Sequence, residues 1–174
     1  MQAVLDSRSH DGWLEAAVTN RTIITGSNEP GAWRPTPPAY GAFVSAGFAS
    51  VQPISAPSLD LFDAPPPPAL NSSEYTRSYK QVLSKGFVNS TTRTADEFEA
   101  LQFWLDKNAA NRWFDLVHYI AHIFNTSLEE NLEMFASISM SQFESTLASF
   151  YAKVKYLRWR PTSGTRVFRI KILS

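Results

Sequence analysis

Apolar side chains recur at steps of three and four residues over the second half of the chain, which is the spacing of one face of an α-helix. The longest series predicts a helix from residue 128 to about residue 159, with the apolar residues Leu128, Leu132, Phe135, Phe143, Leu147, Phe150 and Val154. Shorter series predict helices over 73–85, 95–105 and 110–124. The pattern therefore indicates an all-α fold, in which a partial helical bundle buries the stripe of the long helix.

Polar residues mark the ends of these helices. Thr94 and Ser127 are each followed three residues later by a glutamate, which is the capping-box pattern of a helix start. Ser72 or Ser73 can cap the first of the four helices. Pro161 is expected to end the long helix, because a proline ring clashes with the preceding turn.

The first 70 residues have a different pattern. The pattern of residues 2–9 predicts the last turns of a helix, which is expected to end at Asp11-Gly12. Residues 26–70 are rich in proline and glycine, which predicts extended or polyproline coil. Large apolar side chains are spread through this coil, and a solvated linker would lack them. We therefore expect residues 26–70 to form a long strap laid over the helical body.

Cationic side chains gather at the end of the long predicted helix, where Lys153, Lys155, Arg158 and Arg160 lie within eight residues. If the helix continues through this stretch, Lys153 and Arg160 share a face, because seven steps of about 100° return almost to the same side. A lysine ammonium and a planar arginine fork together suit a tetrahedral oxyanion. The alternative is that these cations only meet the negative end of the helix dipole.

Composition narrows the class of protein. A chain of 174 residues with 44% hydrophobic residues is one domain's worth of globular protein. A net charge of zero gives no indication of a nucleic-acid partner, and the absence of cysteine excludes disulfides and cysteine-ligated metals. No apolar run reaches the roughly 18 residues that a membrane span needs. The compartment is left open.

His118 and His122 have the spacing of two zinc ligands on one helix face. The zinc-protease motif requires a glutamate directly after the first histidine, and Tyr119 stands there. The sequence suggests no third ligand, so packed or capping histidines are the favoured interpretation.

The segment from Ala152 to Pro161, in which Lys153 is followed by Arg160 and a proline, resembles the first active-site motif of vanadium-dependent haloperoxidases and the related type 2 phosphatidic acid phosphatases. In that superfamily the lysine and arginine hold vanadate or phosphate, which implies the same role for Lys153 and Arg160. Bacterial-type haloperoxidases have a further arginine six positions after the first, and Arg166 stands there.

The resemblance covers most of the chain. The segments that are similar to bacterial-type haloperoxidases are 11–12, 30–38, 66–75, 90–96, 103–104 and 128–131. It implies a division into an N-terminal helix end and strap (1–70), a partial haloperoxidase-like bundle (71–166) and a divergent tail (167–174). The tail, VFRIKILS, alternates apolar and basic residues as a strand does.

The chain departs from the family in its histidines. The family completes its site with a Ser-Gly-His and an Arg-x-x-x-His motif downstream, and neither is present in this sequence. His10, His118 and His122 all precede the basic stretch. We therefore expect a fragment that is inactive as given.

These observations lead to one expectation and two alternatives. The chain resembles part of a vanadium-dependent haloperoxidase, for which vanadate is the implied cofactor and hydrogen peroxide and halide are the implied substrates of an intact relative. The alternatives are an acid phosphatase that uses the same pocket, and a non-catalytic helical scaffold. Apolar helix faces that remain uncovered are expected to drive self-association.

Overall fold

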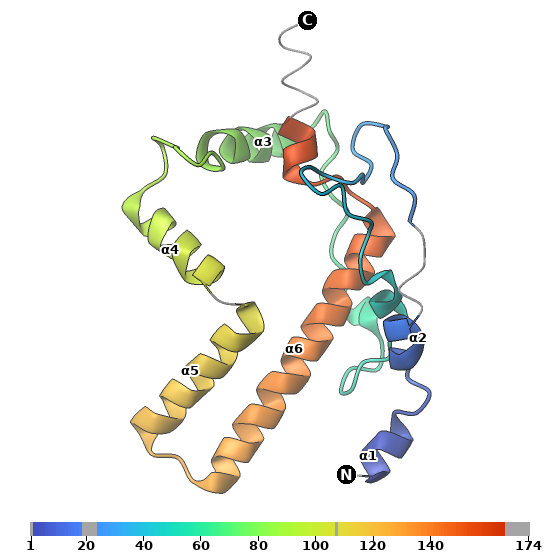
Figure 1. Ribbon diagram of the computed structural model, residues 1–174, viewed down its shortest axis with the longest axis vertical. Helices are drawn as coiled ribbons and strands as arrows, with labels where there is room; N and C mark the ends of the chain where they lie inside the picture. The colour runs from blue at the N-terminus through green and yellow to red at the C-terminus, as the bar shows by residue number, and fades with distance from the viewer. Residues whose placement is uncertain (1, 19–23, 107, 166–174) are drawn as a thin grey trace, which may run out of the picture. The chain divides into compact units, whose positions relative to one another are not determined.

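The computed structural model describes residues 2–18, 24–106 and 108–165 (Figure 1). These residues form helices, short 3-10 turns and coil, with no strand among them. The elements are α1 (Gln2–Ser7), α2 (Trp13–Val18), η1 (Ala46–Ser50), η2 (Leu59–Phe62), α3 (Ser73–Lys85), α4 (Ala95–Asp106), α5 (Ala109–Phe124) and α6 (Leu128–Tyr156). The all-α fold with a long coil strap is confirmed. Arg166 and the strand-like tail 167–174 lie outside the described residues.

Packing divides the chain into two compact units. Unit 1 comprises Met1–Ser90 with Leu147–Ser174, and unit 2 comprises Thr91–Thr146. The long helix α6 contributes its first turns to unit 2 and its last turns to unit 1. The boundaries expected at residues 70 and 166 rest on composition and resemblance. The two units rest on packing instead, so they do not test those boundaries.

The predicted helix starts are confirmed by their hydrogen bonds. The N–H of Glu97 donates to Thr94 Oγ1 at 3.2 Å, and the N–H of Thr94 donates to the Glu97 carboxylate at 3.0 Å. Ser127 and Glu130 make the same reciprocal pair, and the backbone N–H and hydroxyl of Ser127 lower the pKa of Glu130. Ser72 caps α3 by accepting from the N–H of Tyr75 at 3.0 Å. Such patterns act within one helical turn, so the sequence alone determines them.

Helix α2 was not predicted, and the role expected of Asp11 was wrong. Helix α1 ends at Ser7, and Asp11 accepts from the N–H of Trp13 at 2.8 Å, so it caps the start of α2. The Trp13 ring stacks on Phe48 at 5.2 Å, and Phe48 meets Phe150 of α6 edge-on at 5.5 Å. These aromatic contacts pack α2 and the strap onto the end of α6.

The predicted end of α6 was also wrong. The helix ends at Tyr156, and Leu157 adopts a left-handed conformation with φ of 41°. Pro161 does not stop a helix but opens the helical residues 161–165. Proline is favoured in a first helical turn because its missing N–H would have no partner there.

The strap explains why the helix ends early. The N–H of Trp33 donates to the carbonyl of Leu157 at 2.6 Å, and the N–H of Trp159 donates to the carbonyl of Gly31 at 2.9 Å. Ala32 and Arg158 thus form an antiparallel bridge. These bonds satisfy the carbonyl of Leu157 and the N–H of Trp159 where the helical pattern ends.

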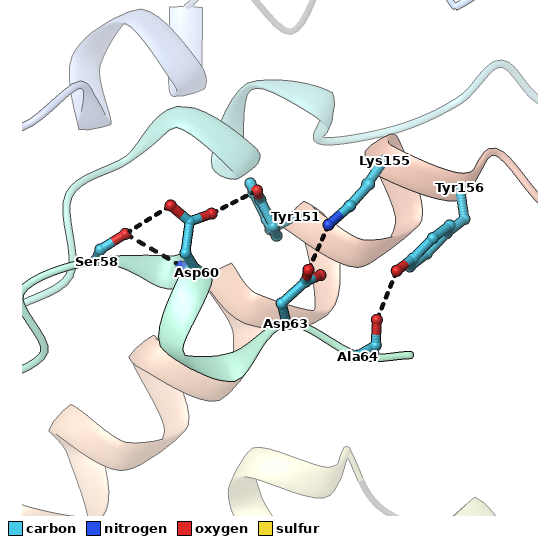
Figure 2. A network of polar contacts seen from close by, with 7 residues as sticks. All are labelled: Ser58, Asp60, Asp63, Ala64, Tyr151, Lys155 and Tyr156. Atoms are coloured by element: carbon cyan, nitrogen blue, oxygen red, sulfur yellow. Dashed lines mark hydrogen bonds and ion pairs between the residues drawn. The ribbon is translucent and has the colours of Figure 1, made fainter. Parts of the chain in front are cut away.

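A polar network ties the strap to the last turns of α6 (Figure 2). The Tyr151 hydroxyl donates to Asp60 and the Tyr156 hydroxyl to the carbonyl of Ala64, both at 2.6 Å. Lys155 forms an ion pair with Asp63. The bond from Tyr151, with one from Ser58, lowers the pKa of Asp60, while the bond to Asp60 raises the pKa of Tyr151. The predicted packing of the strap on the helical part of the chain is thus found at the last turns of α6.

Unit 2 contains α4, α5 and the first turns of α6. Phe135 of α6 lies 6.0 Å from the Phe114 ring and 4.8 Å from the His118 ring of α5. Leu128 and Leu132 are 70% and 64% exposed, so the first turns of the predicted apolar stripe do not face a core formed by the described residues. In unit 1, by contrast, Leu147 of the same stripe is 1% exposed.

Two further observations concern the described part of the chain as a whole. No cluster of three His, Cys, Asp or Glu side chains in it is placed to hold a metal ion. None of its helices is both long enough and apolar enough to cross a membrane.

Candidate oxyanion-binding site

A cleft of about 810 Å³ lies in unit 1, lined by the strap on one side and by the end of α6 and the following residues on the other. The strap contributes residues 33–39, 41–44 and Pro67, and the other side consists of Ser149, Phe150, Ala152, Lys153, Tyr156 and residues 158–161. Its aromatic lining residues are Trp33, Phe43, Phe150, Tyr156 and Trp159. The volume is within the range of sites that hold small organic molecules. We call it the cationic cleft, because four cationic side chains line it.

Lys153 and Arg160 both line the cationic cleft. The predicted reason was wrong, because Arg160 lies beyond the end of α6 and cannot share a helical face with Lys153. The two side chains meet the same cleft because the backbone turns at Leu157 and then pairs with the strap.

The four clustered cations fall into two kinds. Lys155 forms an ion pair with Asp63, and Arg158 donates to the carbonyl of Pro68 at 2.9 Å and lies 5.3 Å over the Tyr75 ring. Lys153 and Arg160 are exposed, and their side chains make no ion pair or hydrogen bond to any described residue. The Lys153 ammonium lies 4.3 Å from the centre of the Phe150 ring. Of the four clustered cations, Lys153 and Arg160 are therefore the two without a polar partner in the described part of the chain. They are also the two that match the haloperoxidase motif.

Arg34 and Arg158 complete the set of cations lining the cleft. Arg34 was not predicted as a site residue from the sequence. Its only indication in the sequence was its place in the segment 30–38, which resembles the family. Sequence spacing cannot show that residues 34 and 160 line the same cleft. No aspartate, glutamate or histidine is found among the described residues that line the cleft.

A second cavity, of about 530 Å³, adjoins Arg160. Val82, Leu83 and Phe87 form its apolar side, and the threonines Thr162 and Thr165 form part of the other. Arg160 and Pro161 line both this cavity and the cationic cleft. Arg160 therefore stands between a cationic site and an apolar one.

The side chains that line the cationic cleft are of the types that bind a multiply charged anion. Lysine supplies a compact charge and arginine a fork of N–H donors that matches two oxygens of phosphate or vanadate. No lining carboxylate among the described residues competes for these donors. The residues present thus fit a tetrahedral oxyanion.

Comparisons with known proteins support the fold. No protein-family model matches the sequence, and no curated protein matches it significantly. A solved structure of a bacterial vanadium-dependent iodoperoxidase matches with a TM-score of 0.75 and 20% sequence identity, over 91% of this chain. The match covers 40% of the iodoperoxidase chain, so this chain spans less than half of that protein's length. The chain therefore has a helical fold like that of part of a vanadium haloperoxidase.

Proposed function

We propose that the chain binds a tetrahedral oxyanion, vanadate or phosphate, in the cationic cleft, as part of a vanadium haloperoxidase-like protein. One observation carries the proposal. Lys153 and Arg160, which match the lysine and arginine of the haloperoxidase motif, line one cleft and lack a polar partner in the described part of the chain. The similarity to the iodoperoxidase fold supports it independently.

Each residue has a distinct part in the proposal. Lys153 supplies a point charge, and Arg160 supplies two parallel donors that orient the oxyanion. Arg158 donates to the carbonyl of Pro68 in the strap and lies over the Tyr75 ring of α3, so it keeps this wall of the cleft in place. A bound vanadate would activate hydrogen peroxide toward a halide. Hydrogen peroxide and halide are therefore the proposed substrates of the whole protein.

The affinity of the chain for an inorganic oxyanion should be low. A hydrogen bond to a charged group contributes about 1.5–3 kcal/mol, and the lost translational and rotational freedom offsets much of that. We expect a dissociation constant on the order of a millimolar, which corresponds to about −4 kcal/mol.

Equilibrium dialysis against radiolabelled phosphate tests the proposal, because it measures binding whatever the association state of the chain. The unaltered chain should bind phosphate, and unlabelled vanadate should compete. The double variant Lys153→Gln/Arg160→Gln should lose this binding. The matched control is Lys80→Gln/Arg77→Gln, which removes the same charges from exposed positions of α3 outside the cleft. Equal binding by both double variants would contradict the proposal.

A further inference from the structure

Arg34 has features that its place in the strap does not explain. Its Nη2 donates to the carbonyl of Glu29 at 2.8 Å, and its guanidinium carbon lies 5.8 Å from the centre of the Trp159 ring. Its Nε is buried and has no hydrogen-bond acceptor among the described residues. A buried N–H without an acceptor is unfavourable, and such groups are uncommon in folded proteins.

The cleft beside Arg34 has no countercharge among its described lining residues. Arg34 lines the cationic cleft together with Lys153, Arg158 and Arg160, and the lining residues that the structure describes include no carboxylate. Like charges in one cleft repel each other, so an anion that meets several of them relieves the repulsion. The aromatic contact with Trp159 and the bond to Glu29 hold the guanidinium in place before an anion arrives.

We propose that Arg34 is a third ligand for the oxyanion, contributed by the strap, and this rests on the function proposed for Lys153 and Arg160. The anion then bonds to residues from both sides of the cleft, the strap on one side and the residues from 153 to 160 on the other. Binding therefore ties the strap to the end of α6 in addition to positioning the anion. The ligand chemistry is a tetrahedral oxyanion with at least three free oxygens.

The first experiment compares phosphate binding by equilibrium dialysis for the unaltered chain, Arg34→Gln, Arg34→Lys and the control Arg77→Gln. Arg34→Gln should weaken binding about ten-fold, because one charge-assisted hydrogen bond is lost. Arg34→Lys should weaken it less, because lysine keeps the charge and loses the fork. Arg77→Gln should leave it unchanged. Dialysis against phenyl phosphate, which leaves three free oxygens, tests whether an ester binds like the free ion.

A second measurement uses the unaltered chain, so it does not depend on a variant folding. Arginine side chains are modified with phenylglyoxal, with and without phosphate, and each position is followed by mass spectrometry. Phosphate should protect Arg34 and Arg160 and leave Arg77 reactive.

The outcomes separate this inference from the function it rests on. Phosphate binding that depends on Lys153 and Arg160 but neither needs nor protects Arg34 would overturn the role of Arg34 alone. Absence of phosphate binding by the unaltered chain would overturn both.

Discussion

At the scale of single residues, the two lysines on either side of Val154, Lys153 and Lys155, have different environments. Lys153 has no ion pair among the described residues, whereas Lys155 pairs with Asp63, which raises the pKa of Lys155. Lys153→Gln should therefore weaken phosphate binding about ten-fold and leave the strap attached. Lys155→Gln should leave binding nearly unchanged and expose the strap around Asp63 to limited proteolysis. The same effect from both variants would show that the two lysines are equivalent.

A second prediction for single residues concerns pH. The pKa of Asp60 is lowered below its ordinary value of 3.8, mainly by the Tyr151 hydroxyl. A lowered folded-state pKa means that the ionised carboxylate stabilises the folded chain above pH 3.8. This stabilisation is lost as the pH falls through the folded-state value. In Tyr151→Phe the pKa of Asp60 should rise toward 3.8, as measured by NMR titration of the carboxyl carbon. An unchanged titration of Asp60 in this variant would show that the hydrogen bond from Tyr151 does not lower the pKa of Asp60.

At the scale of elements, the pairing of the strap with residues 157–159 depends on Gly31. Its φ of 88° favours glycine, and an added Cβ would lie 3.2 Å from Nη1 of Arg158. Gly31→Ala should lower the free energy of unfolding by about 1–2 kcal/mol, measured by urea denaturation. It should also weaken phosphate binding, because Trp33 and Arg34 follow directly in the strap.

The control for this variant is Gly41→Ala, where an added Cβ meets no atom within 4 Å. Replacing Gly41 should not lower the free energy of unfolding, and it is a control for stability alone, because Gly41 itself lines the cationic cleft. If Gly31→Ala behaved like this control, the strap would not depend on the left-handed residue.

At the scale of the whole molecule, we expect the 174-residue chain to bind oxyanion without turnover. None of the described residues lining the cleft is a histidine, and a general acid–base contributes about 10²–10⁴ to a rate. Vanadate-dependent bromination of a chromogenic acceptor should equal that of Lys153→Ala/Arg160→Ala. Bromination above that control would show that the chain is an enzyme by itself.

The exposed apolar side chains lead to a second prediction at this scale. Leu105, Phe124 and Leu128 are 74%, 73% and 70% exposed, which is unusual for large apolar residues on neighbouring helices. We expect the isolated chain to be helical by circular dichroism and to bind the dye ANS or self-associate. A monomer by analytical ultracentrifugation that melts cooperatively and binds no ANS would contradict this.

Short-range patterns were sufficient for much of the fold. The capping boxes at Thr94 and Ser127 and the serine cap of α3 each act within one turn, so the chain carries them without any tertiary contact. The spacing of apolar residues likewise indicated α3, α4, α5 and most of α6. The aromatic residues among the prolines correctly indicated a packed strap.

The site required contacts between residues far apart in the chain. The end of α6 depends on backbone bonds with Gly31 and Trp33, which helical periodicity cannot reveal because the paired residues are 128 and 124 positions apart. Lys153 and Arg160 were chosen for a shared helical face, yet they line one cleft because the helix breaks between them. Arg34 joins them only through the same pairing of the strap. Residue identity thus supplied the charges, whereas tertiary hydrogen bonds decided which of them line one cleft.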